Sequence, residues 1–196
     1  WGSRLAVIVV TIVLLAWTAR NSVPVSFVHG DVPYDFVVYT QTSRDVLDSL
    51  EIIEEAGRRT GQGNALPVFL HPETHWPYAW YLRDHTAIQY ASEMTERPIQ
   101  KIILASDVSA REFGYLMFDY VGIEMKLREW FPEYVYRDWD WNSVRYFVLD
   151  DNFAKLSRFY FFREPPGSLG ASNFVMYIHK ELLTDGPLGR FTLMGS

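Results

Sequence analysis

The side chains best suited to chemistry are concentrated between His71 and His85. The second half of this segment supplies aromatic rings, a guanidinium, a carboxylate and an imidazole, and its candidate ligand- or partner-binding residues are Trp76, Trp80, Arg83, Asp84 and His85. Because Pro77 suits the first turn of a short helix, the spacing predicts both tryptophans and Arg83 on one face. Such a surface can bind a sugar, a phosphate or a partner chain. A packed tryptophan pair with a charged cap explains the same residues equally well.

The first half of the segment raises the alternative of a metal site. His71, Glu73 and His75 carry ligand types that zinc accepts, and Asp84 or His85 would complete the set. Their period-two spacing requires an extended strand, however, and Pro72 disfavours a regular one. We therefore expect solvated loop histidines, with no resident metal and no cofactor, and retain these three residues as secondary candidates only.

The elements that position this segment alternate between strands and helices. Apolar runs at 36–40, 66–70 and 101–105 predict covered strands, and helical spacing after a Thr42–Asp45 capping box predicts a helix that ends near Arg59. A strand–helix–strand order implies a right-handed parallel crossover. The prediction is an α/β fold with a mainly parallel sheet and flanking helices. The candidate site then follows a strand at the carboxyl edge of that sheet, where open α/β sheets bind ligands.

The second half of the chain gives weaker patterns. Residues 109–131 are partly helical by spacing, 137–141 form a predicted turn, and 142–162 fit a helix of about five turns. The Pro165–Gly167 stretch ends that helix, and the alternation at 174–179 predicts a last strand.

The N-terminus differs from the rest of the chain. Residues 5–19 carry no charge, and Arg4 and Arg20 flank them with Trp1 and Trp17 near the ends. This pattern predicts a transmembrane helix over 1–20, with a signal-peptide core or a buried helix as alternatives. A linker over 21–35 and an α/β domain over 36–196 follow. Because the first residue is Trp1 rather than Met, we expect the tail of a longer or processed polypeptide.

Composition narrows the classes of function. The 196 residues include no cysteine, which excludes a thiol nucleophile and any Cys-ligated metal. The net charge is −6, and residues 1–20 contain two arginines and no acidic residue, so the remainder is more acidic than the whole chain. We expect the lipid bilayer as a partner and no nucleic acid.

Several motifs along the chain match a single family. They are Tyr39-Thr40-Gln41-Thr42-Ser43 with Asp45, Trp76-Pro77-x-x-Trp80-Tyr81-Leu82-Arg83-Asp84, Arg128-x-Trp130-Phe131-Pro132-Glu133, Phe162-Arg163-Glu164-Pro165-Pro166 and Leu169-Gly170. In these motifs the chain resembles the flippase-activity-associated family of multi-span membrane proteins, relatives of the dolichyl-phosphate-mannose–protein mannosyltransferases in the GT-C glycosyltransferase superfamily. The resembling region is the last span plus the C-terminal extracytoplasmic domain. The resemblance implies a lipid-linked sugar donor and transfer at the outer face of the membrane.

Two functional hypotheses follow. In the first, the chain is the membrane-anchored extracytoplasmic domain of a GT-C glycosyltransferase, without catalytic activity of its own because the family's other spans and their acidic residue are missing; no catalytic residue is carried over. In the second, it is a non-catalytic single-span accessory or scaffold subunit of a larger membrane complex, such as an energy-transducing one. Both place the domain outside the cytoplasm, beside other membrane spans or subunits.

Overall fold

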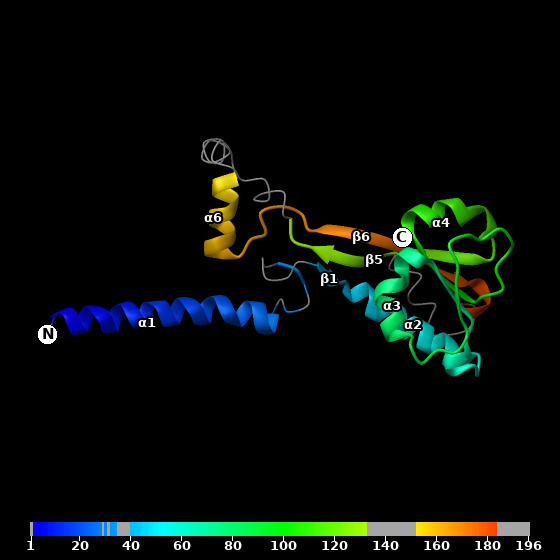
Figure 1. The fold of residues 1–196 in the computed structure, drawn as a ribbon, viewed down its shortest axis with the longest axis horizontal. Helices are drawn as coiled ribbons and strands as arrows, with labels where there is room; N and C mark the ends of the chain where they lie inside the picture. The colour runs from blue at the N-terminus through cyan, green and yellow to red at the C-terminus, as the bar shows by residue number, and fades with distance from the viewer. Residues whose placement is uncertain (1, 29, 31, 35–39, 133–151, 184–196) are drawn as a thin grey trace. The chain divides into compact units, whose positions relative to one another are not determined.

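A computed structural model describes residues 2–28, 30, 32–34, 40–132 and 152–183 (Figure 1). The chain forms two compact units, the first from residues 1–41 and 129–170 and the second from residues 42–128 and 171–196. The predicted turn at 137–141, residues 142–151 of the predicted helix and residues 36–39 of the first predicted strand lie outside the described residues.

Six strands form one sheet in the order β1-β5-β6-β4-β2-β3. Their bounds are Thr40–Thr42 (β1), Val68–Leu70 (β2), Ile88–Tyr90 (β3), Ile102–Ser106 (β4), Tyr120–Trp130 (β5) and Gly170–His179 (β6). Strand β2 pairs in parallel with both β3 and β4, whereas β4 pairs antiparallel with β6, so that Ser106 lies opposite Phe174. The α/β class is confirmed, but the sheet is mixed, and the prediction of a mainly parallel sheet is wrong.

Strand β5 is a second difference from the prediction. Residues 109–131 were expected to be partly helical; the structure has a short helix, α4 (Asp107–Phe113), and then the long strand β5. From Val121 to Arg128 apolar residues alternate with Gly, Glu, Lys and Arg. Strict alternation is typical of a strand covered on one face, as antiparallel strands commonly are.

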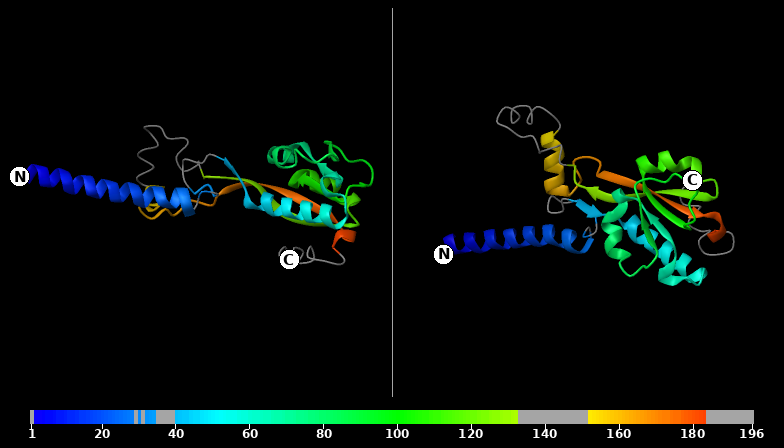
Figure 2. Two further views of the ribbon diagram at one scale, coloured as in Figure 1. Left: turned by 90° about the horizontal axis from the view of Figure 1, so that it is seen from below. Right: turned by 45° about the vertical axis from the view of Figure 1, so that its right-hand side comes forward.

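Helices cover both faces of the sheet in the second unit. Helix α2 (Arg44–Arg59) begins at Ser43, whose hydroxyl accepts from the backbone N–H of Asp45. Its apolar stripe packs with α3 (His75–Tyr81) against one side of β2 and β4, while α4 packs against the other side. Alternate residues of the central strands enter the two cores: Val68 and Leu70 lie in the first, and Phe69 lies in the second. Figure 2 shows these layers from two further directions.

Short helical turns complete the connections of the second unit. They are η2 (Gly63–Ala65), η3 (Pro72–Thr74), η4 (Gly114–Leu116) and η6 (Lys180–Leu182). Gly57 is required where α2 meets η2, because a Cβ atom at that position would lie 2.5 Å from the carbonyl oxygen of Gly63.

The first unit contains helix α1 (Gly2–Val23), which continues into a π-helical turn over Pro24–Val28, and helix α6 (Asn152–Phe162). The helical segment Gly2–Val28 is long and apolar enough to cross a membrane, and it has no buried residue. It continues past the predicted end at residue 20. The rings of Phe131 and Phe159 pack at 5.2 Å in this unit, and both are buried.

Candidate functional site

The candidate site lies at the carboxyl edge of the parallel strands, as the order of elements predicted. Strand β2 ends at Leu70, and the next backbone N–H, that of His71, donates to the carbonyl of Leu104 on β4 at 2.9 Å. The imidazole of His71 then caps η3 by accepting from the N–H of Glu73. Helix α3 follows directly, so the edge of the sheet fixes where its side chains emerge.

Helix α3 is held against the core by Tyr78. This residue is fully buried, its ring packs on Phe174 at 5.7 Å between centroids, and its hydroxyl bonds to the hydroxyl of Ser49 on α2. Burial raises the pKa of Tyr78 above its usual 10.0, with the Ser49 hydrogen bond lowering it and Asp45 raising it further. Leu82, four residues later, is also buried. The opposite side of α3 is therefore left to solvent.

Trp80 and Arg83 come together on this outer side. Trp80 is 62% exposed, and the guanidinium carbon of Arg83 lies 4.8 Å from the centroid of its ring. Nη1 of Arg83 also donates to the carbonyl of Trp80 at 3.1 Å. A cation–π contact at an exposed site contributes about 0.5–1 kcal/mol, enough to favour one orientation of the guanidinium. The predicted adjacency of these two side chains is observed.

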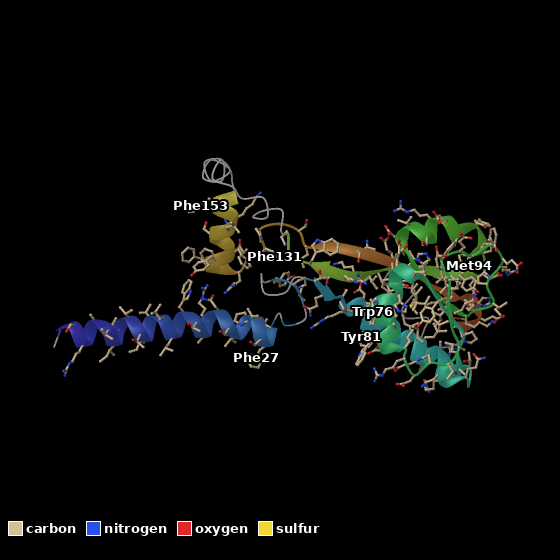
Figure 3. All side chains as sticks on the ribbon, viewed as in Figure 1. Phe27, Trp76, Tyr81, Met94, Phe131 and Phe153 are labelled. Atoms are coloured by element: carbon tan, nitrogen blue, oxygen red, sulfur yellow. The ribbon has the colours of Figure 1, made fainter. Side chains whose placement is uncertain are left out.

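Trp76 is placed differently from the prediction. Its backbone angles (φ −97°, ψ 122°) are not helical, and the bond to Pro77 is cis, so the helical frame does not extend back to this residue. Trp76 is 60% exposed; its ring lies 5.4 Å from that of His75, which in turn lies 5.1 Å from Tyr90 on β3. Nη2 of Arg128 donates to its carbonyl at 2.7 Å. Figure 3 labels Trp76 near the start of α3 and Tyr81 at its end.

The last two predicted site residues, Asp84 and His85, add less to the exposed surface around Trp80 and Arg83. Oδ2 of Asp84 lies 3.8 Å from Nε of Arg83, and both side chains are largely exposed. An exposed ion pair of this kind contributes about 0–1 kcal/mol to the free energy of unfolding. His85 turns inward: its Nδ1 is buried, with no hydrogen-bond partner within the described residues. Burial lowers the pKa of His85, and the carboxylates of Glu54 and Asp84 oppose that shift.

His71 belongs to a polar network that the sequence did not reveal. Its Nδ1 accepts from the N–H of Glu73, so the proton of the neutral ring lies on Nε2, which is 3.1 Å from the hydroxyl oxygen of Ser109. Ser109 also bonds to the hydroxyl of Ser106, which caps α4. A histidine that activates a serine needs an unprotonated Nε2 facing it. In the tautomer that caps η3, Nε2 donates to Ser109 instead, and the network joins the ends of β2 and β4.

The contacts of the two histidines also argue against a metal site at His71, Glu73 and His75. Both ring nitrogens of His71 are engaged, whereas the ring of His75 packs between Trp76 and Tyr90. Within residues 2–28, 30, 32–34, 40–132 and 152–183, no three His, Asp or Glu side chains gather closely enough to hold an ion. His71, Glu73 and His75 thus act as separate local groups.

A cleft of about 320 Å³ lies elsewhere in the second unit and was not predicted. Residues Glu93–Gln100 form most of its wall, together with Phe69 and Gln89. Tyr120 does not line the cleft, but its hydroxyl anchors this loop: it donates to the carbonyl of Gln100 at 2.7 Å and lies 3.2 Å from the carbonyl of Pro98. Irregular loops give no periodic signal, so the sequence offered no means of finding it.

Comparison of the chain with protein-family models, with curated proteins and with solved structures finds no match. The structure therefore defines the class of protein only as a mixed α/β domain with one N-terminal helix apolar enough to span a membrane.

Proposed function

We propose that this chain is a membrane-anchored extracytoplasmic domain that binds the sugar-phosphate part of a lipid-linked donor, as the C-terminal domain of a GT-C glycosyltransferase would. The observation that carries the proposal is the guanidinium of Arg83 stacked on the exposed ring of Trp80. The sequence resemblance suggests the substrate class, and the apolar helix α1 supports the anchor.

The chemistry of the two side chains suits such a ligand. The exposed face of an indole carries negative charge density and apolar area, and the C–H groups on one face of a pyranose can pack against it. Nη1 of Arg83 donates to the carbonyl of Trp80, and Nε lies near the carboxylate of Asp84. Nη2 makes no hydrogen bond within the described residues. A held guanidinium is a good donor to phosphate oxygens. One surface therefore offers a stacking plane and a phosphate donor side by side.

The test uses the full chain in phosphatidylcholine nanodiscs, with mannose 1-phosphate as a soluble probe. Saturation-transfer NMR should show contact to the pyranose C–H protons. Trp80→Ala should abolish that contact, and Arg83→Ala should weaken binding of mannose 1-phosphate to the level of mannose alone. Tyr115→Ala removes an equally exposed ring from the same unit and is the matched control. Equal signals in Trp80→Ala and Tyr115→Ala would refute the proposal.

A specific observation also favours the second hypothesis, an accessory subunit of a larger membrane complex. Exposed Trp, Tyr and Arg side chains are enriched at the centres of protein interfaces, and α3 with β3 presents Trp76, Trp80, Tyr81 and Tyr90. If the sugar probe does not bind, this surface should instead carry partner contacts. Trp76→Ala and Trp80→Ala would then reduce co-purification of a subunit at fixed stoichiometry, whereas Tyr115→Ala would not.

Both hypotheses place the second unit outside the cytoplasm. Protease added to intact right-side-out vesicles should therefore digest it, and complete protection until lysis would reverse the orientation. The flanking residues Arg4 and Arg20 do not decide the matter, because one lies at each end of the apolar run.

A further inference from the structure

Helix α6 has an aromatic surface that the proposed function does not use. Of its eleven residues, four large apolar side chains are exposed: Phe153, Tyr160, Phe161 and Phe162. Such a density of exposed rings on a short helix is unusual for a surface facing water, and it marks an interaction with an apolar medium or partner.

The contacts of α6 indicate which medium this is. The ring of Trp17 on α1 lies 5.5 Å from that of Tyr160 and 5.9 Å from that of Phe161. Arg20 donates through Nη2 to the backbone carbonyl of Phe161, an acceptor in the last turn of α6. The C-terminal end of α6 thus contacts α1 at Trp17, near the end of its apolar run, and at Arg20, which follows that run.

Where α1 crosses a membrane, this position is the one expected at the membrane–water boundary. Tryptophan and arginine at the end of an apolar run are typical of the headgroup region, where an indole is half immersed and an arginine reaches the phosphates. In Figures 1 and 2, α6 runs across α1 rather than along it, with only its C-terminal end beside it. A helix that crosses a membrane span at the level of the headgroups lies along the membrane surface.

The periodicity of α6 gives it two different sides. Positions 153, 157, 160 and 161 recur at the spacing of one helix stripe, and they carry Phe, Ser, Tyr and Phe. Lys155 and Arg158 are exposed and lie on the other side with Phe162. Interfacial helices combine an aromatic face with basic residues in this way.

We propose that α6 is an interfacial helix of the same membrane that α1 crosses. Its 153/157/160/161 stripe is immersed at the headgroup–acyl boundary, and Lys155 and Arg158 contact lipid phosphates. The bilayer would then hold the first unit at two places, the span and a helix lying across its end. This inference does not depend on the sugar-binding role.

The absence of cysteine from the chain makes a site-specific test direct. Single variants Ser157→Cys and Lys155→Cys, two residues apart on opposite sides of α6, carry an environment-sensitive fluorophore in the full chain in phosphatidylcholine nanodiscs. Ile8→Cys within the apolar run of α1 is the immersed control, and Tyr115→Cys is the aqueous control. We expect a blue-shifted, iodide-protected label at 157 and at 8, and an iodide-quenched label at 155 and at 115.

A second set of variants separates immersion from simple shielding by protein. Tyr160→Ser with Phe161→Ser should restore iodide quenching at position 157 while the label at Ile8→Cys stays protected. The matched pair Tyr115→Ser with Phe118→Ser removes two exposed rings elsewhere and should change neither label. Lipids with a nitroxide near the headgroup should quench the label at 157. Equal iodide quenching at 157 and 155, no quenching by these lipids, or an iodide-accessible label at position 8 would overturn the proposal.

Discussion

The hydrogen bond between Ser49 and Tyr78 should stabilise the domain asymmetrically. The hydroxyl of Ser49 donates to the carbonyl of Val46 at 2.6 Å, so its proton is already used. The hydroxyl of Tyr78 must therefore be the donor to Ser49 Oγ. Both residues are fully buried, and water cannot replace either partner. Ser49→Ala strands a buried donor, whereas Tyr78→Phe leaves Ser49 with its bond to Val46.

The magnitudes follow from this difference. A stranded buried hydroxyl costs about 1–3 kcal/mol, and loss of one ordinary net hydrogen bond costs about 0.5–1.5 kcal/mol. Because alanine has a higher helix propensity than serine, Ser49→Ala also gains about 0.5 kcal/mol of stability within α2, which offsets part of this cost. Adding Tyr78→Phe to Ser49→Ala removes the stranded donor, so the double variant should be no less stable than Ser49→Ala alone. The coupling energy should lie between about 0.5 and 3 kcal/mol.

Urea unfolding of the full chain in mild detergent, followed by tryptophan fluorescence, measures the cycle. A change in midpoint with an unchanged slope reports stability alone. Single-variant costs that simply add, within about 0.5 kcal/mol, would refute the hydrogen-bond assignment. Because Tyr78 holds α3, Ser49→Ala should also weaken binding at Trp80 and Arg83 without touching a ligand.

Three further predictions use the same unfolding measurement. Arg83→Ala and Asp84→Ala should each change stability by less than about 1 kcal/mol, as exposed positions do; a larger loss would make the pair a structural clamp. Gly170→Ala should destabilise by about 1–3 kcal/mol through overpacking, because its Cβ would lie 2.0 Å from Nε1 of Trp130, whereas Gly114→Ala, with open space around it, should not. Since burial raises the folded-state pKa of Tyr78 above 10.0, the stability that its neutral form contributes is complete below pH 10 and is lost as pH rises further. Tyr78→Phe should flatten that alkaline loss, and the remaining slope should reflect Tyr120 and Tyr177, whose pKa burial also raises.

The elements that the sequence predicted correctly are those that short-range patterns of apolar residues determine. The continuous apolar run at 101–105 became β4, which is buried along its whole length, and the amphipathic spacing after Ser43 became α2. The mixed sheet was not predicted because strand direction depends on pairing between distant segments. The alternation of apolar and polar residues within β5 is visible in the sequence and is typical of a strand with one covered face. The prediction of partly helical structure over 109–131 did not take it into account.

The place of the candidate segment in the sheet was predicted from the sequence, whereas the arrangement of its side chains was predicted only in part. Its segment follows β2 at the carboxyl edge, and the Trp80–Arg83 contact follows from their spacing of three residues. The position of Trp76 depends on its non-helical backbone and on Arg128, which is 52 residues away in sequence. The Ser109 network of His71 likewise joins residues 38 apart. Contacts over such separations are properties of the tertiary fold, and no local spacing encodes them.

Residue spacing alone does not explain why the tryptophans of this segment are exposed. Trp76 and Trp80 are four residues apart, and so are Tyr78 and Leu82. Either pair could have formed the buried stripe. The polar partner decides between them: α2 offers the hydroxyl of Ser49, which satisfies a buried tyrosine, and the apolar side chain of Leu82 needs no partner. The tryptophans are consequently left outside, where an indole that is usually well buried forgoes much of its burial energy. Of the two, Trp80 carries the stacked guanidinium of Arg83, and this exposed pair is the feature on which the proposed binding site depends.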